Sequence, residues 1–236
     1  MGFTSSHFTG AVTSGELAHR ELQSRPDQWW AGLGHRCIHT TWSSRGSISL
    51  EGLGLQIVRE PQEASFILAH GTEALSVPSD GGRIEVIEQS LEQLFDLLER
   101  CAALLEPPPM VVANPDMVTT SGAELIPMPG TLAKKYADLN PKCQVRLCGK
   151  PDPIIYNACK DALGLHPSEV LAVGDSLEHD IAGAAAAGID SLFIAGGIHQ
   201  KEVCKGNTGS VDMDALEALS RQHQAVPTYV VPELRW

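Results

Sequence analysis

The feature that most constrains the fold is the stretch VLAVGDSLEHDIAGAAAAGIDSLFIAGG, which spans residues 170–197. It holds two short apolar runs separated by a small-residue segment with a helical pattern, and glycines mark the turns between them. A strand, a helix and a strand of these lengths form a βαβ unit, in which the two strands are parallel. Ligands of such sheets bind at the carboxyl ends of the strands. The sequence therefore places Asp175, Ser176 and the pair Gly196-Gly197 at one edge of a parallel sheet.

The rest of the chain alternates between apolar runs and helical patterns, which predicts an α/β fold. We expect helices over 14–22, 84–105, 130–139 and 153–163, strands over 37–42, 64–69, 110–113 and 145–148, and a loop over 71–82. The helix over 84–105 has the clearest spacing, and the prolines at 107–109 stop it. Gly164 is expected to cap the helix over 153–163.

The charge balance excludes one broad class of partner. The chain has 29 acidic and 17 basic residues and a formal net charge of −12, whereas a protein that binds nucleic acid needs a basic face. No apolar run reaches the length of about 18 residues that a membrane span requires, so we expect no membrane partner. Six cysteines without metal-binding spacing predict free thiols in a reducing compartment, hence a cytoplasmic protein.

The letters Gly-Asp-Ser-Leu at 174–177 allow two kinds of chemistry. In the first, Ser176 is a nucleophile, because these letters resemble the signature of the GDSL esterases; that chemistry needs an oriented base, and the chain contains no Asp-x-x-His. In the second, Asp175 and Asp180 hold Mg²⁺, which prefers oxygen ligands and is usually bound by one or two carboxylates and a phosphate. A phosphate there would also meet the N-terminus of the next helix.

Lys150 favours the second interpretation. It directly precedes a predicted helix and lies 25 residues before Asp175. A lysine at that place can neutralise charge on a transferring phosphoryl group. The structural alternatives are an exposed loop lysine at 150 and, at 180, an acid that only interacts with the helix dipole.

Three segments together, GKPDPIIYNACKDALGL, VLAVGDSLEHDIAGAAAAGI and LFIAGGIH, resemble the third and fourth motifs of the haloacid dehalogenase (HAD) superfamily, and more narrowly its subclass IIA phosphatase-like hydrolases. This resemblance implies a Rossmann-like parallel-sheet core with an inserted α/β cap domain, and a Mg²⁺-dependent phosphatase reaction through an aspartyl-phosphate. It implies that Lys150 stabilises this intermediate and that Asp175 and Asp180 serve the metal. Gly174 and Ser176 are then expected to lie at the substrate.

The cap of that subclass is similar to the segments TSGELAHREL, ANPDM and MPGTLAKKY. By this resemblance, Asn114 and Asp116 lie where the cap approaches the substrate. Alternatively, they have only a structural role and form an Asn-Pro-Asp turn. We expect residues 1–30 to be a remnant of the core with the linker into the cap, 31–147 to be the cap, and 148–236 to be the C-terminal part of the core.

The family's first two motifs have no counterpart where they are expected. The nucleophile belongs to an Asp-x-Asp after the first strand, but the only Asp-x-Asp starts at Asp212, follows the fourth motif and predicts a helix N-cap. We therefore expect a core that is incomplete at its N-terminus and lacks the nucleophile. Its exposed sheet edge would favour aggregation or pairing between copies.

These observations favour a HAD-like hydrolase whose ancestral reaction is Mg²⁺-dependent hydrolysis of a small phosphorylated metabolite. This chain is expected to be inactive or weakly active because no phosphoaspartate can form without a nucleophile. The alternatives are a non-catalytic domain that binds metal, phosphate or a partner, and a GDSL-type serine esterase.

Overall fold

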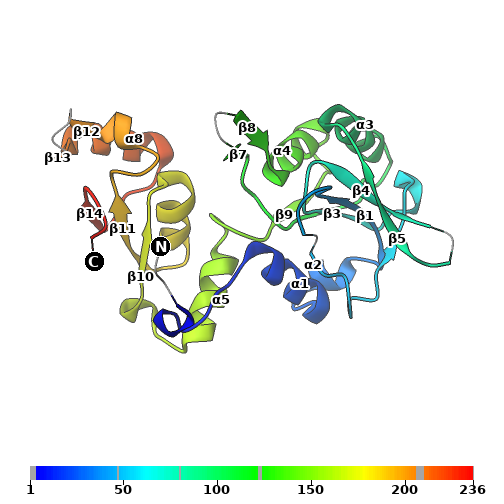
Figure 1. Cartoon of the computed structure of the whole chain (residues 1–236), viewed down its shortest axis with the longest axis horizontal. Helices are drawn as coiled ribbons and strands as arrows, with labels where there is room; N and C mark the ends of the chain where they lie inside the picture. Colours follow the sequence, from blue (N-terminus) through cyan, green and yellow to red (C-terminus); the bar gives the residue numbers. More distant parts are fainter. Residues whose placement is uncertain (1–3, 47, 80, 122–123, 206–209, 236) are drawn as a thin grey trace. The chain divides into compact units, whose positions relative to one another are not determined.

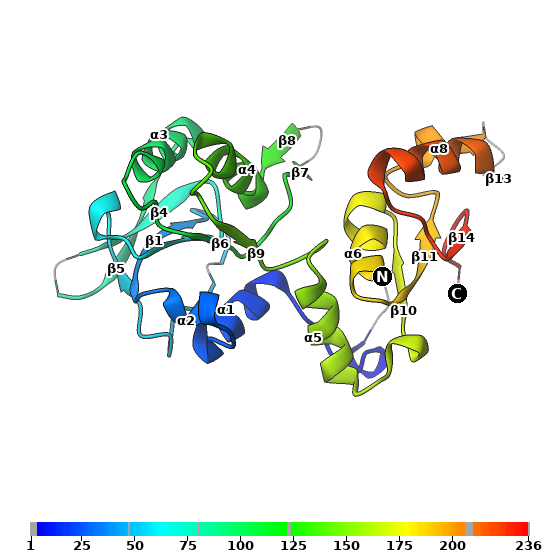
Figure 2. The same cartoon turned by 180° about the vertical axis from the view of Figure 1, so that it is seen from behind.

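The computed structural model describes residues 4–46, 48–79, 81–121, 124–205 and 210–235 (Figures 1 and 2). The chain divides into two compact units. One comprises Thr13–Gly149, and the other comprises Lys150–Trp236 together with Met1–Val12. We call them the Thr13–Gly149 unit and the Lys150–Trp236 unit and describe each by itself. The assignment of 31–147 to a cap and 148–236 to a core stays a prediction.

The Thr13–Gly149 unit is built around one mixed sheet. Within the described residues seven strands form it in the order β5-β4-β1-β3-β6-β9, with β2 paired to β1. β1, β2, β3, β6 and β9 are parallel, whereas β4 and β5 are antiparallel. The strands are β1 (Arg36–Thr41), β2 (Gln56–Ile57), β3 (Phe66–Ala69), β4 (Ala74–Pro78), β5 (Ile84–Glu88), β6 (Met110–Val112) and β9 (Val145–Leu147).

Helices cover both faces of this sheet, which explains why its inner strands are apolar on both sides. The helices are α1 (Ser14–Ser24), α2 (Gln28–Gly32), α3 (Leu91–Ala102) and α4 (Pro129–Leu139). Figures 1 and 2 show α3 and α4 on one side of the sheet and α1 and α2 on the other. Side chains alternate between the two faces along each strand: Ile67 packs with α3 and α4, while the neighbouring Phe66 is equally buried on the opposite face.

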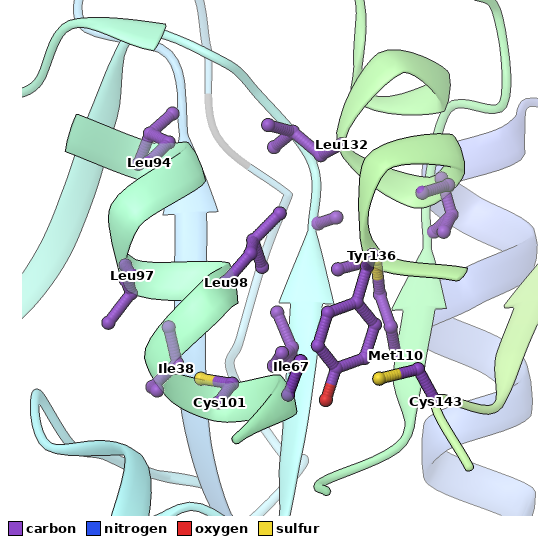
Figure 3. Close-up of a cluster of buried hydrophobic side chains, with 14 of the residues drawn as sticks. Ile38, Ile67, Leu94, Leu97, Leu98, Cys101, Met110, Leu132, Tyr136 and Cys143 are labelled. Atoms are coloured by element: carbon purple, nitrogen blue, oxygen red, sulfur yellow. The ribbon is translucent and has the colours of Figure 1, made fainter. Parts of the chain in front are cut away.

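The core between the sheet, α3 and α4 is the larger of the two clusters of buried side chains described here (Figure 3). Leu94, Leu98 and Cys101 of α3 pack against Ile38 and Ile67 of the sheet. Tyr136 of α4 lies in the same cluster and donates its hydroxyl proton to the carbonyl oxygen of Pro108 at 2.8 Å. The hydroxyl is therefore hydrogen-bonded despite its burial.

Two predicted elements in this unit are wrong. The expected loop over 71–82 contains strand β4, and the expected helix over 84–105 is strand β5 followed by the shorter helix α3. β4 and β5 form a hairpin whose turn includes Gly81 and Gly82, both at positive φ, a conformation that glycine adopts without strain. α3 begins after Ser90, where a reciprocal capping box closes its first turn.

The remaining predicted elements of this unit are confirmed with small shifts of their ends. α1 begins after the N-cap Thr13, and α4 has Pro129 at its first position, where a missing N–H costs nothing. A separate two-stranded ribbon precedes α4 and consists of β7 (Val118–Ser121) and β8 (Glu124–Pro127). A short 3₁₀ turn occupies Pro61–Glu63 in this unit, and two others occupy Ser5–His7 and Pro167–Glu169 in the Lys150–Trp236 unit.

The Lys150–Trp236 unit contains a parallel sheet in the order β10-β11-β14. Its elements are α5 (Pro153–Leu163), β10 (Leu171–Gly174), a π-helical turn (Leu177–Ile181), α6 (Ala182–Ala186), β11 (Asp190–Ile194), α7 (Gln200–Val203), β12 (Cys204–Lys205), β13 (Ser210–Val211), α8 (Met213–His223) and β14 (Tyr229–Val231). β10 and β11 confirm the predicted parallel βαβ unit. Pairing of copies through the free edge of β10 stays a prediction.

Helix ends in this unit follow the sequence signals. α5 ends at Gly164, which has a φ of 65°, and α8 begins after Asp212, whose carboxylate accepts the amide protons of Asp214 and Ala215. Together with the parallel strands, these helices confirm the predicted α/β fold class. No helix in the described parts of the chain is both long and apolar enough to cross a membrane.

Candidate functional site

The candidate site lies at the carboxyl end of β10, where the chain leaves the sheet. Asp175 follows the last residue of this strand, and its Oδ2 accepts the amide proton of Ile198 at 3.0 Å. Ile198 comes from the loop after β11, beside Gly197, where a Cβ would overlap the carboxylate of Asp175. Because β10 and β11 are parallel, both strand ends reach the same edge, as the sequence predicted.

Asp180 receives three hydrogen bonds. Its Oδ2 accepts the amide protons of Asp175 at 3.1 Å and of Ser176 at 3.0 Å, and its Oδ1 accepts a proton from Lys150 Nζ at 2.8 Å. The carboxylate lies directly against Gly174, where a Cβ would overlap it. Gly174 therefore makes room for Asp180, which is the role that the structure shows for this residue.

Lys150 and Asp180 form an ion pair in which the lysine side chain is 47% exposed and the aspartate 13%. Lys150 lies two residues before Asp152, the N-cap of α5. The pair joins residues that lie 30 positions apart in the sequence. The structure thus joins Lys150 to Asp180 by an ion pair and Asp175 to Asp180 through its backbone amide, and these are the three residues that the sequence selected.

Ser176 is turned inward. It is only 7% exposed, and its Oγ accepts the amide proton of His179 at 3.1 Å and lies 2.9 Å from His179 Nδ1. This is the geometry of a helix N-cap. His179, which the motif alone did not connect to the serine, is therefore its hydrogen-bonding partner.

The donor set suits a hard divalent cation. Asp175 and Asp180 offer carboxylate oxygens within one turn, and Mg²⁺ uses one or two such oxygens with water and phosphate completing its shell. A carboxylate has about four lone-pair sites, so Asp180 retains acceptor capacity after its three hydrogen bonds. In the part of the chain that the structure describes, no group of three or more His, Cys, Asp or Glu side chains could hold a metal.

Asn114 and Asp116 belong to the Thr13–Gly149 unit. Asn114 follows β6, and its Oδ1 accepts the amide proton of Asp116 at 3.2 Å, which is the Asx turn expected as the structural alternative. The start of α4 packs against this turn. The Gly130 amide donates to the Asp116 carbonyl at 2.9 Å, and a Cβ on Gly130 would overlap the carbonyl oxygen of Pro115. A substrate contact of Asn114 or Asp116 stays a prediction.

Two contributors to the site were missed from the sequence. Ile198 contributes its backbone amide, and only the glycine pair before it marked that loop. Tyr156 of α5 donates its hydroxyl proton to the carbonyl oxygens of His179 at 3.1 Å and Asp180 at 3.0 Å. No local pattern connects a tyrosine in one helix to the turn before another, so spacing alone could not identify it.

Comparisons with known proteins identify the family to which this chain belongs. A family model described as haloacid dehalogenase-like hydrolase matches residues 61–188, and one described as HAD-hydrolase-like matches residues 147–236. The first match covers more than half of the chain. This chain therefore belongs to the haloacid dehalogenase-like hydrolases, which confirms the resemblance of its motifs.

Individual relatives match over different lengths. Chronophin from Rattus norvegicus is 26% identical over 245 residues, which cover 99% of this chain and 68% of that protein. Acid sugar phosphatase from Staphylococcus epidermidis is 32% identical over 92 residues, so the match spans 39% of this chain and only 35% of that relative's length. The structure of a haloacid dehalogenase-like hydrolase from Brucella suis 1330 superimposes with a TM-score of 0.63 and 26% identity, covering 95% of this chain and 72% of that one.

Proposed function

We propose that the site formed by Lys150, Asp175 and Asp180 serves the Mg²⁺-dependent hydrolysis of a small phosphate ester. The observation that carries this proposal is the ion pair of the Lys150 ammonium with Asp180 beside the carboxyl end of a parallel strand, where the backbone amide of Asp175 binds the same carboxylate. Family membership supports a hydrolase, and the name of the acid sugar phosphatase supports a phosphorylated sugar as the substrate class.

Each residue has a distinct part in this proposal. Asp175 and Asp180 would hold Mg²⁺, which when bound supplies charge stabilisation to a phosphoryl oxygen. Lys150 neutralises negative charge on the phosphoryl group, and its ion pair with Asp180 orients the ammonium. The backbone amides after β10 orient the Asp180 carboxylate, and the amide of Ile198 orients that of Asp175.

We further propose that these 236 residues alone hydrolyse phosphate esters at a negligible rate. An aspartyl-phosphate route needs an attacking carboxylate besides the two that hold the metal. In the described residues no third acidic, histidine or cysteine side chain joins Asp175 and Asp180 in a metal-binding group. The chain would then bind Mg²⁺ and phosphate without turnover, in the cytoplasm, with the Thr13–Gly149 unit as its cap.

Calorimetric titration with Mg²⁺ and an assay with p-nitrophenyl phosphate test both proposals. Binding is expected in the wild type and in Asp161→Asn, a control at an exposed position of α5, and is expected to disappear in Asp175→Asn. Equal Mg²⁺ affinity in wild type and Asp175→Asn would refute the site. Phosphatase turnover that Asp175→Asn abolishes would refute the proposed inactivity while supporting the reaction.

A serine esterase is the second candidate, favoured by the 2.9 Å separation between Ser176 Oγ and His179 Nδ1. Serine hydrolysis also requires an acid that orients the histidine, and the inward position of Ser176 favours an N-cap instead. Hydrolysis of p-nitrophenyl acetate that is lost in Ser176→Ala would establish this candidate, and an equal rate in both proteins would eliminate it.

A further inference from the structure

Tyr156 contacts the turn that carries Asp180 although it lies in a different helix. Its hydroxyl donates to two successive backbone carbonyls, those of His179 and Asp180, at 3.1 and 3.0 Å. Neither hydrogen bond involves the side-chain carboxylate of Asp180. Its hydrogen bonds instead fix the main chain from which the carboxylate projects.

The segment that Tyr156 holds is a π-helical turn, Leu177–Ile181. The amide of Ile181 donates to the Ser176 carbonyl, five residues back, at 3.1 Å, and the amide of Asp180 donates to the same oxygen at 2.9 Å. π-Helical turns are rare and occur often at functional sites. The carbonyl oxygen of His179 also accepts the amide proton of Ala182, so Tyr156 adds a second donor to it from another helix.

Gly183 provides the space for the tyrosine ring. A Cβ at this position would overlap the ring carbons and the hydroxyl of Tyr156. Burial raises the pKa of the Tyr156 hydroxyl above its usual value, and the charge of Asp180 raises it further, so the group keeps its proton and remains a donor. Gly183 of α6 therefore leaves the space that the ring of Tyr156 from α5 occupies.

We propose that Tyr156 is a positioning residue that holds Asp180 where its carboxylate meets Lys150 and the amides of Asp175 and Ser176. Without the hydroxyl, the π-helical turn loses the donor shared by two carbonyls, and the Asp180 carboxylate moves away from its three partners. The hydrogen-bonding part of this proposal stands on its own geometry. The effect on cation binding rests on the proposed function.

Hydrogen–deuterium exchange of individual amides in Tyr156→Phe tests the positioning role. The amides of Asp175 and Ser176, which donate to Asp180, are expected to exchange about fivefold faster than in the wild type, as expected when a typical hydrogen bond is weakened. The matched control is Tyr136→Phe, which removes a tyrosine hydroxyl bonded to a backbone carbonyl in the other unit. It is expected to leave both amides unchanged.

Gly183→Ala provides a second variant, because its methyl group displaces the Tyr156 ring without removing the hydroxyl, and it is expected to accelerate the same two amides. Wild-type exchange at both amides in Tyr156→Phe would overturn the proposal. A uniform acceleration throughout the Lys150–Trp236 unit would also overturn it, because that is the result of general destabilisation.

Mg²⁺ titration of the same variants tests the consequence for the cation. Affinity is expected to fall about tenfold in Tyr156→Phe, a loss typical for residues that orient metal ligands, and to stay unchanged in Tyr136→Phe. A wild-type protein that does not bind Mg²⁺ would refute the metal part of the proposed function. The exchange rates would still decide whether Tyr156 positions Asp180.

Discussion

Acidification is expected to destabilise the Thr13–Gly149 unit through one buried histidine. His39 lies on β1 with an exposed fraction of 1%, and its Nδ1 hydrogen-bonds with Ser76 Oγ at 2.9 Å. Its Nε2 has no hydrogen-bond partner among the described residues, and the ring of His70 stacks 6.3 Å away. Burial, together with the smaller effect of the neighbouring His70, lowers the pKa of His39 to about 3, so the folded protein holds a neutral imidazole.

The sign and size of the effect follow from proton linkage. The unfolded chain binds a proton at His39 with a pKa of about 6.5, whereas the folded chain does so only near 3. The stability of the fold is therefore complete above pH 6.5 and is lost as the pH falls from 6.5 towards 3. Each pH unit in this window costs about 1.4 kcal/mol, which gives about 2 kcal/mol at pH 5.

Urea unfolding followed by tryptophan fluorescence measures this loss, because Trp29, Trp30 and Trp42 all lie in the same unit. The wild type is expected to lose about 2 kcal/mol more than His39→Gln between pH 7.5 and pH 5, since glutamine does not titrate. His35→Gln, at an exposed position before β1, should retain the wild-type pH dependence. Equal losses in the wild type and His39→Gln would refute the reasoning.

Three further changes test the packing of this unit. Leu98→Ala is expected to lower the free energy of unfolding by about 2–5 kcal/mol, and a loss below about 1 kcal/mol in urea would contradict its place in the core. Ser90→Ala removes one half of the capping box with Gln93 and should cost about 1 kcal/mol by the same measurement; no change would show that α3 does not depend on this cap. Gly130→Ala places a methyl group against the Pro115 carbonyl, so its melting temperature should fall further than that of Ser90→Ala, and an equal or smaller fall would refute the close approach.

The errors in the fold prediction have a common physical cause. The letters IEVIE at 84–88 are rich in β-branched residues, which favours a strand, but Ile87 also fits the helical series that continues through α3. The helical series therefore includes residues of β5, which pair with β4. Ser90 and Gln93, which form a capping box, are the local signal for the true start of the helix. The turn residues near Gly81 and Gly82 suggested a loop because hairpins and loops share the same letters.

The two carboxylates of the site could be predicted because they lie close together in the sequence. Asp175 follows a strand, and Asp180 lies five residues later in the first turn of the next helix, so their spacing predicts that both carboxylates lie at the sheet edge. The contacts of Tyr156 and Ile198 lie 23 or 24 residues from their partners. Such contacts depend on how α5 and the loop after β11 pack, and packing over that separation leaves no periodic signal in the sequence.

The hydrogen bonds of Asp180 distinguish its role from that of an acid that only interacts with the helix dipole. Such an acid would accept amide protons of its own helix, whereas Asp180 accepts those of Asp175 and Ser176, which precede the helical segment, and a proton from Lys150. Lys150 Nζ and the amides of Asp175 and Ser176, its hydrogen-bond partners among the described residues, are all donors. An asparagine could offer its oxygen to the ammonium or to the two amides, and its own NH₂ would then face donors on the other side. Only a carboxylate can accept protons from the ammonium and from the two amides at once. The contacts that join the turn, the strand end and Lys150 therefore also require an acid at position 180.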